Sequence, residues 1–225
     1  MSLISRRGFD GKSWLTSLRA SIWITIVCVV GFLLAWLVLW QGAPSWNRAG
    51  AIAFYNLLSS SPSIFIVGCI ATVGDDIWIP LVFYLYVFRK DQHDWNSALI
   101  LAVAMVSATT LVTILKLAFG LPRPFQVASL GIEPRFETPT DHGLPSGHTT
   151  TAFTVATIIW SRYSTWRIPF IVLAIATGVC MMILGLHFPS DVIAGAFLGM
   201  FCGTFAVTLS NIRSGDHSPD GAQTE

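Results

Sequence analysis

The chain has 225 residues, of which 53% are hydrophobic and only 11% are charged, whereas a soluble domain carries about 25% charged residues. This composition excludes an ordinary soluble domain and indicates an integral membrane protein whose length suits a single helical bundle. A formal net charge of +1, with no long run of Lys or Arg, also argues against a nucleic-acid partner.

The N-terminal part combines a polar, basic segment with a long apolar run. Residues 1–19 carry Lys and Arg side chains and are expected to form a cytoplasmic segment. Residues 20–40 suit a membrane-spanning helix, which needs ~20 apolar residues, and exceed the roughly 7–15 residues of a signal-peptide core. We therefore expect a retained helix, with a cleaved signal as the alternative because Gly42–Ser45 is small and turn-like.

Five further apolar runs follow along the chain. The segment 120–144, rich in Pro, Gly and charged residues, divides them and predicts a loop. Residues 211–225 are polar and predict a disordered cytoplasmic tail. With the first run, these segments predict an all-α membrane protein of six transmembrane helices in one bundle over residues 20–210. The five later runs cover approximately residues 63–88, 98–119, 149–160, 168–186 and 192–209.

The distribution of basic residues predicts the orientation in the membrane. Six helices put both termini on one side, and most Lys and Arg side chains fall in the terminal segments and in the loops on that same side. Because cytoplasmic loops are enriched in these residues, we expect the termini to be cytoplasmic, in an inner or plasma membrane. The segments 116–148 and 187–191 then fall at the extracytoplasmic ends of their helices.

The first of three polar motifs pairs Lys116 with Arg123-Pro124, in the pattern K-x6-R-P. A lysine near the end of an apolar helix is costly unless it is paired or reaches the interface. Gly120 and Pro122 break the helix, so that Arg123 can turn back towards Lys116. A lysine charge and an arginine fork together suit a phosphate; the alternative is two interfacial anchors that face lipid headgroups.

The second motif, Pro145-Ser146-Gly147-His148, opens the fourth predicted helix. The free N–H groups of a helix start bind anions, and Gly147 lets the backbone approach a ligand closely. The Ser146 hydroxyl adds a donor or caps the helix. His148 would stand beside a bound anion as a proton donor, or would be a polar residue at the membrane boundary.

The third motif is His187 and Asp191, in the pattern H-x3-D. Pro189 suits the first position of a helix, which puts Asp191 in the first turn and within reach of His187. A carboxylate on one ring nitrogen fixes the tautomer and makes the other nitrogen a better nucleophile. The alternative is a capping aspartate beside an interfacial histidine.

Two further groups of polar residues stand out. Asp75 and Asp76 interrupt an apolar run, which is costly and favours a functional role, unless the helix breaks near Gly74 and leaves them solvated. Carboxylate and imidazole groups also permit a metal site, although the nearby cations Lys116 and Arg123 would repel a metal ion. The residues of this metal-site alternative are Asp141, His142, His148 and His187.

The three motifs in this order resemble the type 2 phosphatidic acid phosphatase (PAP2) superfamily, in particular its membrane lipid phosphate phosphatases; a haloperoxidase of the same superfamily suits the apolar chain less well. The resemblance implies a nucleophile, His187, that forms a phosphohistidine. It also implies that His148 protonates the leaving oxygen, that Asp191 orients His187, and that no metal or other cofactor is required. The implied phosphate ligands are Lys116, Arg123, Ser146 and Gly147.

The chain departs from the family pattern at one position. The third motif of the family reads S-R-x5-H-x3-D, but Cys180 and Met181 stand here where the family has Ser and Arg. Either another cation replaces the missing arginine, with Arg135 as the candidate phosphate ligand, or the site is weakened, specialised or inactive.

These features predict a membrane phosphatase that acts on a lipid phosphate or diphosphate at the extracytoplasmic face. The candidate substrates are phosphatidic acid, phosphatidylglycerol phosphate and polyprenyl diphosphate. One alternative is a phosphotransferase that passes the phosphoryl group to an alcohol. Another is a non-catalytic lipid-phosphate binder or transporter, which the loss of the arginine at Met181 would permit.

Overall fold

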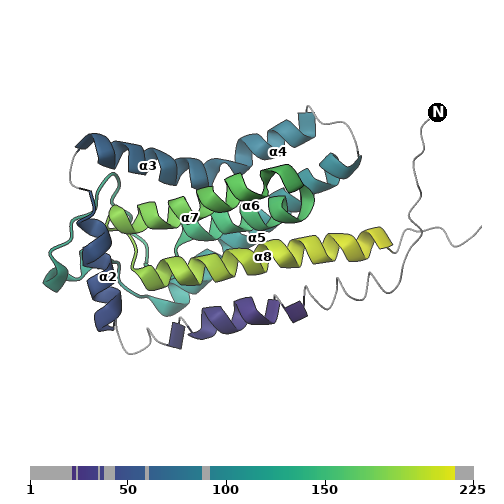
Figure 1. Cartoon of the computed structure of the whole chain (residues 1–225). Helices are drawn as coiled ribbons and strands as arrows, with labels where there is room; N and C mark the ends of the chain where they lie inside the picture. The colour runs from purple at the N-terminus through teal and green to yellow at the C-terminus, as the bar shows by residue number, and fades with distance from the viewer. Residues whose placement is uncertain are drawn as a thin grey trace, which may run out of the picture.

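The computed structural model describes residues 22–23, 25–34, 36–37, 44–58, 61–87 and 92–215. Every regular element in these ranges is a helix, which confirms the all-α class. The long helices lie side by side in one elongated bundle, and α2 (Ser45–Tyr55) lies across one end of it (Figure 1). The predicted cytoplasmic segment, residues 1–19, lies outside the described residues.

Three described helices are long and apolar enough to cross a membrane: α5 (Gln92–Phe119), α7 (Arg167–Ile183) and α8 (Pro189–Gly215). A fourth span forms if α3 (Ser61–Asp76) and α4 (Trp78–Val87), which are bent by 46° at Ile77, count as one broken helix. The remaining apolar helices are shorter: α6 (Gly147–Arg162) has 16 residues, and another covers Thr25–Leu34. Six spans therefore remain a prediction.

The start of α8 agrees with the sequence-based prediction, whereas its end does not. The helix begins at Pro189, as the preference of proline for the first helical position predicts. It continues to Gly215, although the tail was predicted to begin at residue 211. The rest of that predicted tail, residues 216–225, lies outside the described part of the chain.

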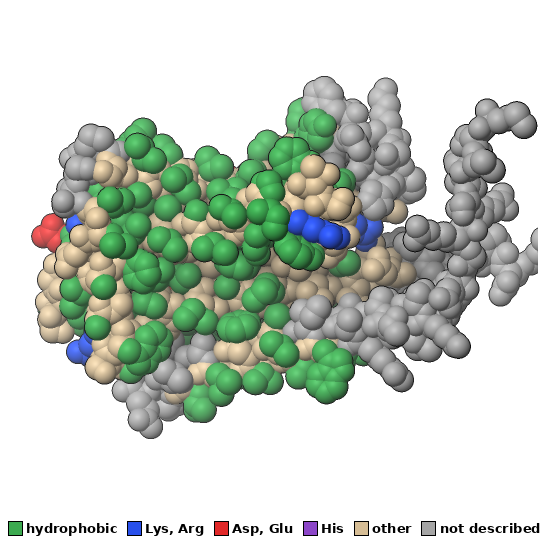
Figure 2. Space-filling model, in the orientation of Figure 1, with side chains coloured by type: hydrophobic (Ala, Val, Ile, Leu, Met, Phe, Trp, Pro, Cys, Tyr) green, Lys and Arg blue, Asp and Glu red, His purple; other side chains and the backbone are tan. Residues whose placement is uncertain are grey.

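The surface of the bundle matches a lipid environment. Large apolar side chains are exposed along the helices, among them Leu117, which is 73% exposed, and Val106, which is 66% exposed. Figure 2 shows hydrophobic side chains over most of one face, with basic side chains towards both sides and acidic ones at one end only. Apolar exposure on this scale is typical of a surface that contacts lipid instead of water.

Close packing of α6 against α8 places the second and third motifs next to each other. Gly195, Gly199 and Gly203 recur every fourth residue on α8, and a Cβ at Gly195 would lie 2.7 Å from the Ser146 carbonyl oxygen. A Cβ at Gly199 would collide with the carbonyl oxygen of Thr150. Small residues at this spacing let two helix backbones approach closely in a membrane. The start of α6 is therefore held beside the start of α8.

We predict that Gly199→Leu destabilises the bundle, because its side chain would force α6 and α8 apart. Overpacking of this kind costs about 1–3 kcal/mol, and thermal unfolding of the purified protein in detergent measures it. Phe205→Leu is the matched control, since Phe205 lies on the same helix and is 51% exposed. An unchanged unfolding temperature for Gly199→Leu would contradict the close α6–α8 contact.

Candidate active site

The three motifs converge where α8 begins, because Arg123 contacts His187 and the Ser146 backbone N–H donates to the Asp191 carbonyl. Figure 1 shows that α2 lies across this end of the bundle. Lys116 lies in the last turn of α5, which ends where Gly120 adopts a positive φ of 60°. Ser146 is the residue that precedes α6, and His187 lies just before the first turn of α8. Arg123 lies in the loop that connects α5 with α6. Helix ends therefore supply most of the polar groups.

Lys116 and Arg123 together hold the carboxylate of Asp141. The Lys116 ammonium lies 2.5 Å from one carboxylate oxygen, and a terminal nitrogen of Arg123 lies 2.5 Å from the other. Arg123 Nε also donates to the Asp141 backbone carbonyl at 3.1 Å. The two basic side chains are 10% and 4% exposed, whereas that of Asp141 is 52% exposed. The cations thus form an anion site that a half-exposed loop carboxylate fills.

The ionisation of Asp141 follows from these contacts. Burial by itself would raise the pKa of the Asp141 carboxyl. The hydrogen bond and charge of Lys116, joined by those of Arg123, outweigh burial and hold this pKa below its usual value. Because the pKa is lowered, Asp141 stays charged at neutral pH and remains in place as an internal anion.

We predict that Asp141→Asn tightens the binding of an added oxyanion such as orthovanadate, because a neutral amide competes less well for the two cations. The expected gain is about fivefold, which corresponds to ~1 kcal/mol for a partly exposed ion pair. Isothermal titration with vanadate measures it, and Glu137→Gln, an exposed residue of the same loop, is the control. Weaker binding by Asp141→Asn would mean that Asp141 supports the anion site instead of competing for it.

His187 lies between Arg123 and Asp191. Its Nδ1 is 3.4 Å from Asp191 Oδ2, and its Nε2 is 3.1 Å from a terminal nitrogen of Arg123. If Nδ1–H donates to Asp191, the lone pair of Nε2 points to the cations that hold Asp141. Asp191 also accepts the backbone N–H of Phe188 at 3.0 Å, so it caps α8 and orients His187 at once. The same carboxylate therefore contacts both the His187 ring and the start of α8.

His187 is almost completely buried, with 2% of its surface exposed. Burial, followed by the positive charges of Arg123, Lys116 and His148, holds the pKa of His187 well below its usual value. The imidazole is therefore neutral at physiological pH, which a nucleophilic or basic role requires.

The start of α6 contributes an open backbone and a buried hydroxyl. Ser146 makes no capping hydrogen bond to α6, and its hydroxyl accepts one from Thr149 at 3.0 Å. A Cβ at Gly147 would meet only Val112, at 3.8 Å, so space is open beside this backbone. An anion can approach the first N–H groups of α6 here. His148 follows, with its Nε2 3.6 Å from the carboxylate of Asp75.

Groups outside the anion site surround the two residues that bear on the missing family arginine, Arg135 and Met181. Arg135 donates to the backbone carbonyls of Tyr55 at 2.9 Å and Leu58 at 2.6 Å, and its guanidinium stacks on the Tyr55 ring at 3.6 Å. Met181 is 1% exposed and belongs to an apolar cluster with Val67 and Leu184. These contacts show Arg135 fastening the loop to the end of α2, and they do not favour it as the replacement ligand.

Asn47 on α2 is a supporting residue that the sequence did not reveal. It is completely buried, donates to the Ser190 hydroxyl at 2.8 Å and accepts the Ser190 backbone N–H at 3.1 Å. These two bonds fix the first turn of α8 beside His187. In the sequence Asn47 is a single polar residue shortly after Pro44, and no pattern around it indicates a partner 143 positions away.

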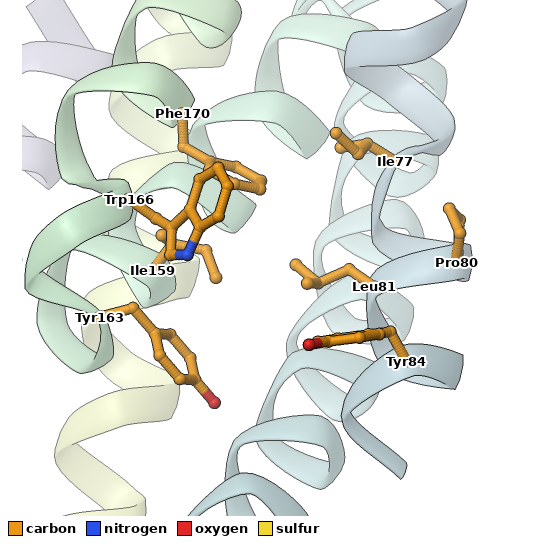
Figure 3. Close-up of a pocket in the computed structure, with 8 residues that line it drawn as sticks. All are labelled: Ile77, Pro80, Leu81, Tyr84, Ile159, Tyr163, Trp166 and Phe170. Atoms are coloured by element: carbon orange, nitrogen blue, oxygen red, sulfur yellow. The ribbon is translucent and has the colours of Figure 1, made fainter. Parts of the chain in front are cut away.

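Two further questions concern a metal site and a cavity outside the three motifs. Within the described residues, no three His, Cys, Asp or Glu side chains are placed to hold a metal ion. An apolar cavity of about 450 Å³ lies between α4, α6 and α7, where the hydroxyls of Tyr84 and Tyr163 point into the opening (Figure 3). None of its lining residues belongs to the three motifs.

Comparison with known proteins identifies the family. The family model described as PAP2 superfamily matches residues 97–214, slightly more than half of the chain. The chain belongs to the PAP2 superfamily. The resemblance inferred from the three motifs is thereby confirmed, and Lys116, Arg123, Ser146–His148 and His187–Asp191 all lie within the matched residues.

Two curated relatives of this PAP2 protein act on lipids, according to their names. An undecaprenyl-diphosphatase of Sulfolobus acidocaldarius is 28% identical over 60% of this chain and 64% of the relative. A lipid A 1-phosphatase of Rhizobium etli is 35% identical over 57% of this chain and 63% of the relative. The matches thus span less than two thirds of the length of each relative.

A solved structure supports the same fold. The transmembrane PAP2 type phosphatidylglycerolphosphate phosphatase of Bacillus subtilis superposes with a TM-score of 0.68 over 88% of this chain and 98% of its own, at 19% identity. The apolar helices and this neighbour together establish that the chain is an integral membrane protein of PAP2 fold.

Proposed function

We propose that this protein is a lipid phosphate or diphosphate phosphatase that works through a phosphohistidine at the extracytoplasmic face. The observation that carries the proposal is the buried His187, whose Nε2 faces Arg123 while Arg123 and Lys116 already hold a carboxylate. A phosphate that took the place of the Asp141 carboxylate would bind Arg123, which also contacts Nε2.

The proposed reaction has two steps. Nε2 of His187 attacks phosphorus, the bond from phosphorus to the lipid oxygen breaks, and that oxygen takes a proton from His148. Water then attacks the phosphohistidine, gives a proton back to His148 and releases inorganic phosphate. Lys116 and Arg123 stabilise the charge that develops on the phosphoryl oxygens, and Asp191 stabilises the positive imidazole.

The surroundings of the site and the names of the relatives support the proposed substrate class. An apolar surface keeps the lipid tail in the bilayer while the headgroup reaches the polar end of the bundle. Undecaprenyl diphosphate, lipid A and phosphatidylglycerol phosphate, to which the names of the compared proteins point, are all lipids with a phosphate headgroup. We therefore place phosphatidic acid, phosphatidylglycerol phosphate and polyprenyl diphosphate in the first substrate panel.

The test is the release of inorganic phosphate from this panel by purified protein in detergent, with and without a chelator. Release that resists the chelator is the expected result. Transfer of the phosphoryl group to an added alcohol, in preference to water, would identify a phosphotransferase. Binding of the lipids without turnover would identify a non-catalytic binder and overturn the proposal.

We predict that the acidic limb of the kcat/KM profile lies well below pH 6.5. Because the pKa of His187 is lowered from 6.5, its imidazole stays neutral as the pH falls through that value and becomes protonated only further down. Rates with a short-chain phosphatidic acid, measured after confirming that the protein survives each pH, locate the limb. A limb centred at 6.5 or above would mean that His187 titrates as a solvated side chain.

A further inference from the structure

A second histidine–carboxylate pair stands beside the one formed by His187 and Asp191. His148 Nε2 lies 3.6 Å from Asp75 Oδ2, and the two side chains are 27% and 31% exposed. Asp75 is the residue before the last in α3, a largely apolar helix, where a carboxylate is energetically costly unless it has a partner or a functional role. Hydrogen bonds between catalytic groups are often long before the substrate binds, so this separation suits a working contact.

The packing of α3 fixes Asp75 in this place. A Cβ on Gly74, the preceding residue, would collide with the Thr177 hydroxyl, so α3 lies directly against α7 at this point. Thr177 is completely buried. Immediately after Asp76 the chain bends by 46° into α4. Adjacent helical residues point about 100° apart, and Asp76 is accordingly exposed while Asp75 meets His148.

We propose that Asp75 is a positioning residue for His148, the proton donor to the leaving oxygen; this inference rests on the proposed phosphatase function. When this contact closes on substrate binding, the carboxylate accepts a hydrogen bond from Nε2–H, turns Nδ1 towards the substrate and stabilises the positive charge that His148 carries before it donates. The site then contains two histidines with separate carboxylates. His187 with Asp191 acts as a nucleophile, and His148 with Asp75 acts as an acid.

In the proposed reaction Asp75 keeps the same charge throughout. His148 gives its proton to the lipid oxygen as the phosphorus–oxygen bond breaks. It takes a proton from the water that later attacks phosphorus on His187. Asp75 stays ionised through both steps and transfers no proton itself.

The experiment compares two probes that share a tail but differ in the group that leaves. Farnesyl phosphate must expel an alkoxide, which needs a proton, whereas farnesyl diphosphate expels a phosphate monoester, a far more stable anion. Asp75→Asn is expected to lower kcat on the monophosphate by about 100-fold, in the range of lost acid catalysis, and to lower it much less on the diphosphate. Asp75→Glu should recover part of the loss, and Asp76→Asn, the adjacent exposed carboxylate, should resemble the wild type.

Two results would overturn this inference. One is an equal fall in kcat on both probes, together with weaker vanadate inhibition or a lower unfolding temperature, which would give Asp75 a structural role.

The second result would come from 15N-histidine NMR spectra of the full-length protein. In these spectra Asp75→Asn should shift the ring signals of His148, whereas Asp76→Asn should not. Unchanged signals in Asp75→Asn would remove the contact itself. A wild type that hydrolyses neither probe would instead contradict the proposed function, and the spectra would still decide the contact.

Discussion

His187→Ala is expected to abolish turnover, with kcat falling on the order of 10⁴- to 10⁶-fold, as when a nucleophile is removed from a catalytic group. The reason is that Nε2 of His187 is the ring nitrogen that faces the anion site, while Nδ1 is turned to Asp191. Quenching the wild type during turnover should trap phosphate on the protein that is labile in acid and stable in base. The variant should trap none.

His142→Ala is the matched control for this substitution, because His142 is a partly buried histidine of the neighbouring loop. It should keep both turnover and the trapped phosphate. Equal trapping on His187→Ala and on the wild type would remove His187 from the role of nucleophile, even if the rate fell.

Arg123→Ala is expected to lower kcat/KM by roughly 100- to 1,000-fold, the range for the loss of one donor that stabilises a developing negative charge. Arg123 donates to both the backbone and the side chain of Asp141, lies against His187 Nε2, and has a side chain only 4% exposed. The inhibition constant of vanadate should rise in parallel, by roughly 10- to 100-fold for one charge-assisted bond.

Arg135→Ala separates this result from a general effect of removing an arginine from the loop. Because Arg135 bonds to the carbonyls of Tyr55 and Leu58, its loss should lower the unfolding temperature and leave vanadate inhibition nearly unchanged. If Arg135→Ala weakened vanadate as much as Arg123→Ala does, Arg135 would be the replacement for the arginine that Met181 displaces.

The helix ends that form the site were predictable from the sequence because local chemistry determines them. Gly120 stops α5 after Lys116, and α8 begins at Pro189. The prediction of one helix over the apolar run 63–88 was less accurate, since the structure divides it into α3 and α4 at Ile77. A run of apolar residues indicates that a segment is buried in lipid, but it does not indicate where the helix axis bends.

The polar contacts within the site were much harder to predict. The sequence permits Asp141 as a metal ligand, whereas in the structure it binds Lys116 and Arg123. The sequence does not identify a partner for Asp75, which is His148 in the structure. Such pairs join residues that are distant along the chain, and only the crossing of the helices brings them within reach. Residue types and spacing identify which groups are costly to bury, but not which partner satisfies each one.

The carboxylate of Asp141 can be regarded as a tethered competitor at a fixed effective concentration. Because it occupies Lys116 and Arg123, it weakens the apparent affinity of every incoming oxyanion by the same factor. A lipid substrate offsets that factor with the partitioning of its tail into the bilayer, whereas free inorganic phosphate has no tail. Under the proposed phosphatase reaction, released phosphate would be held more weakly by that full factor, while the tail would keep the lipid near the site.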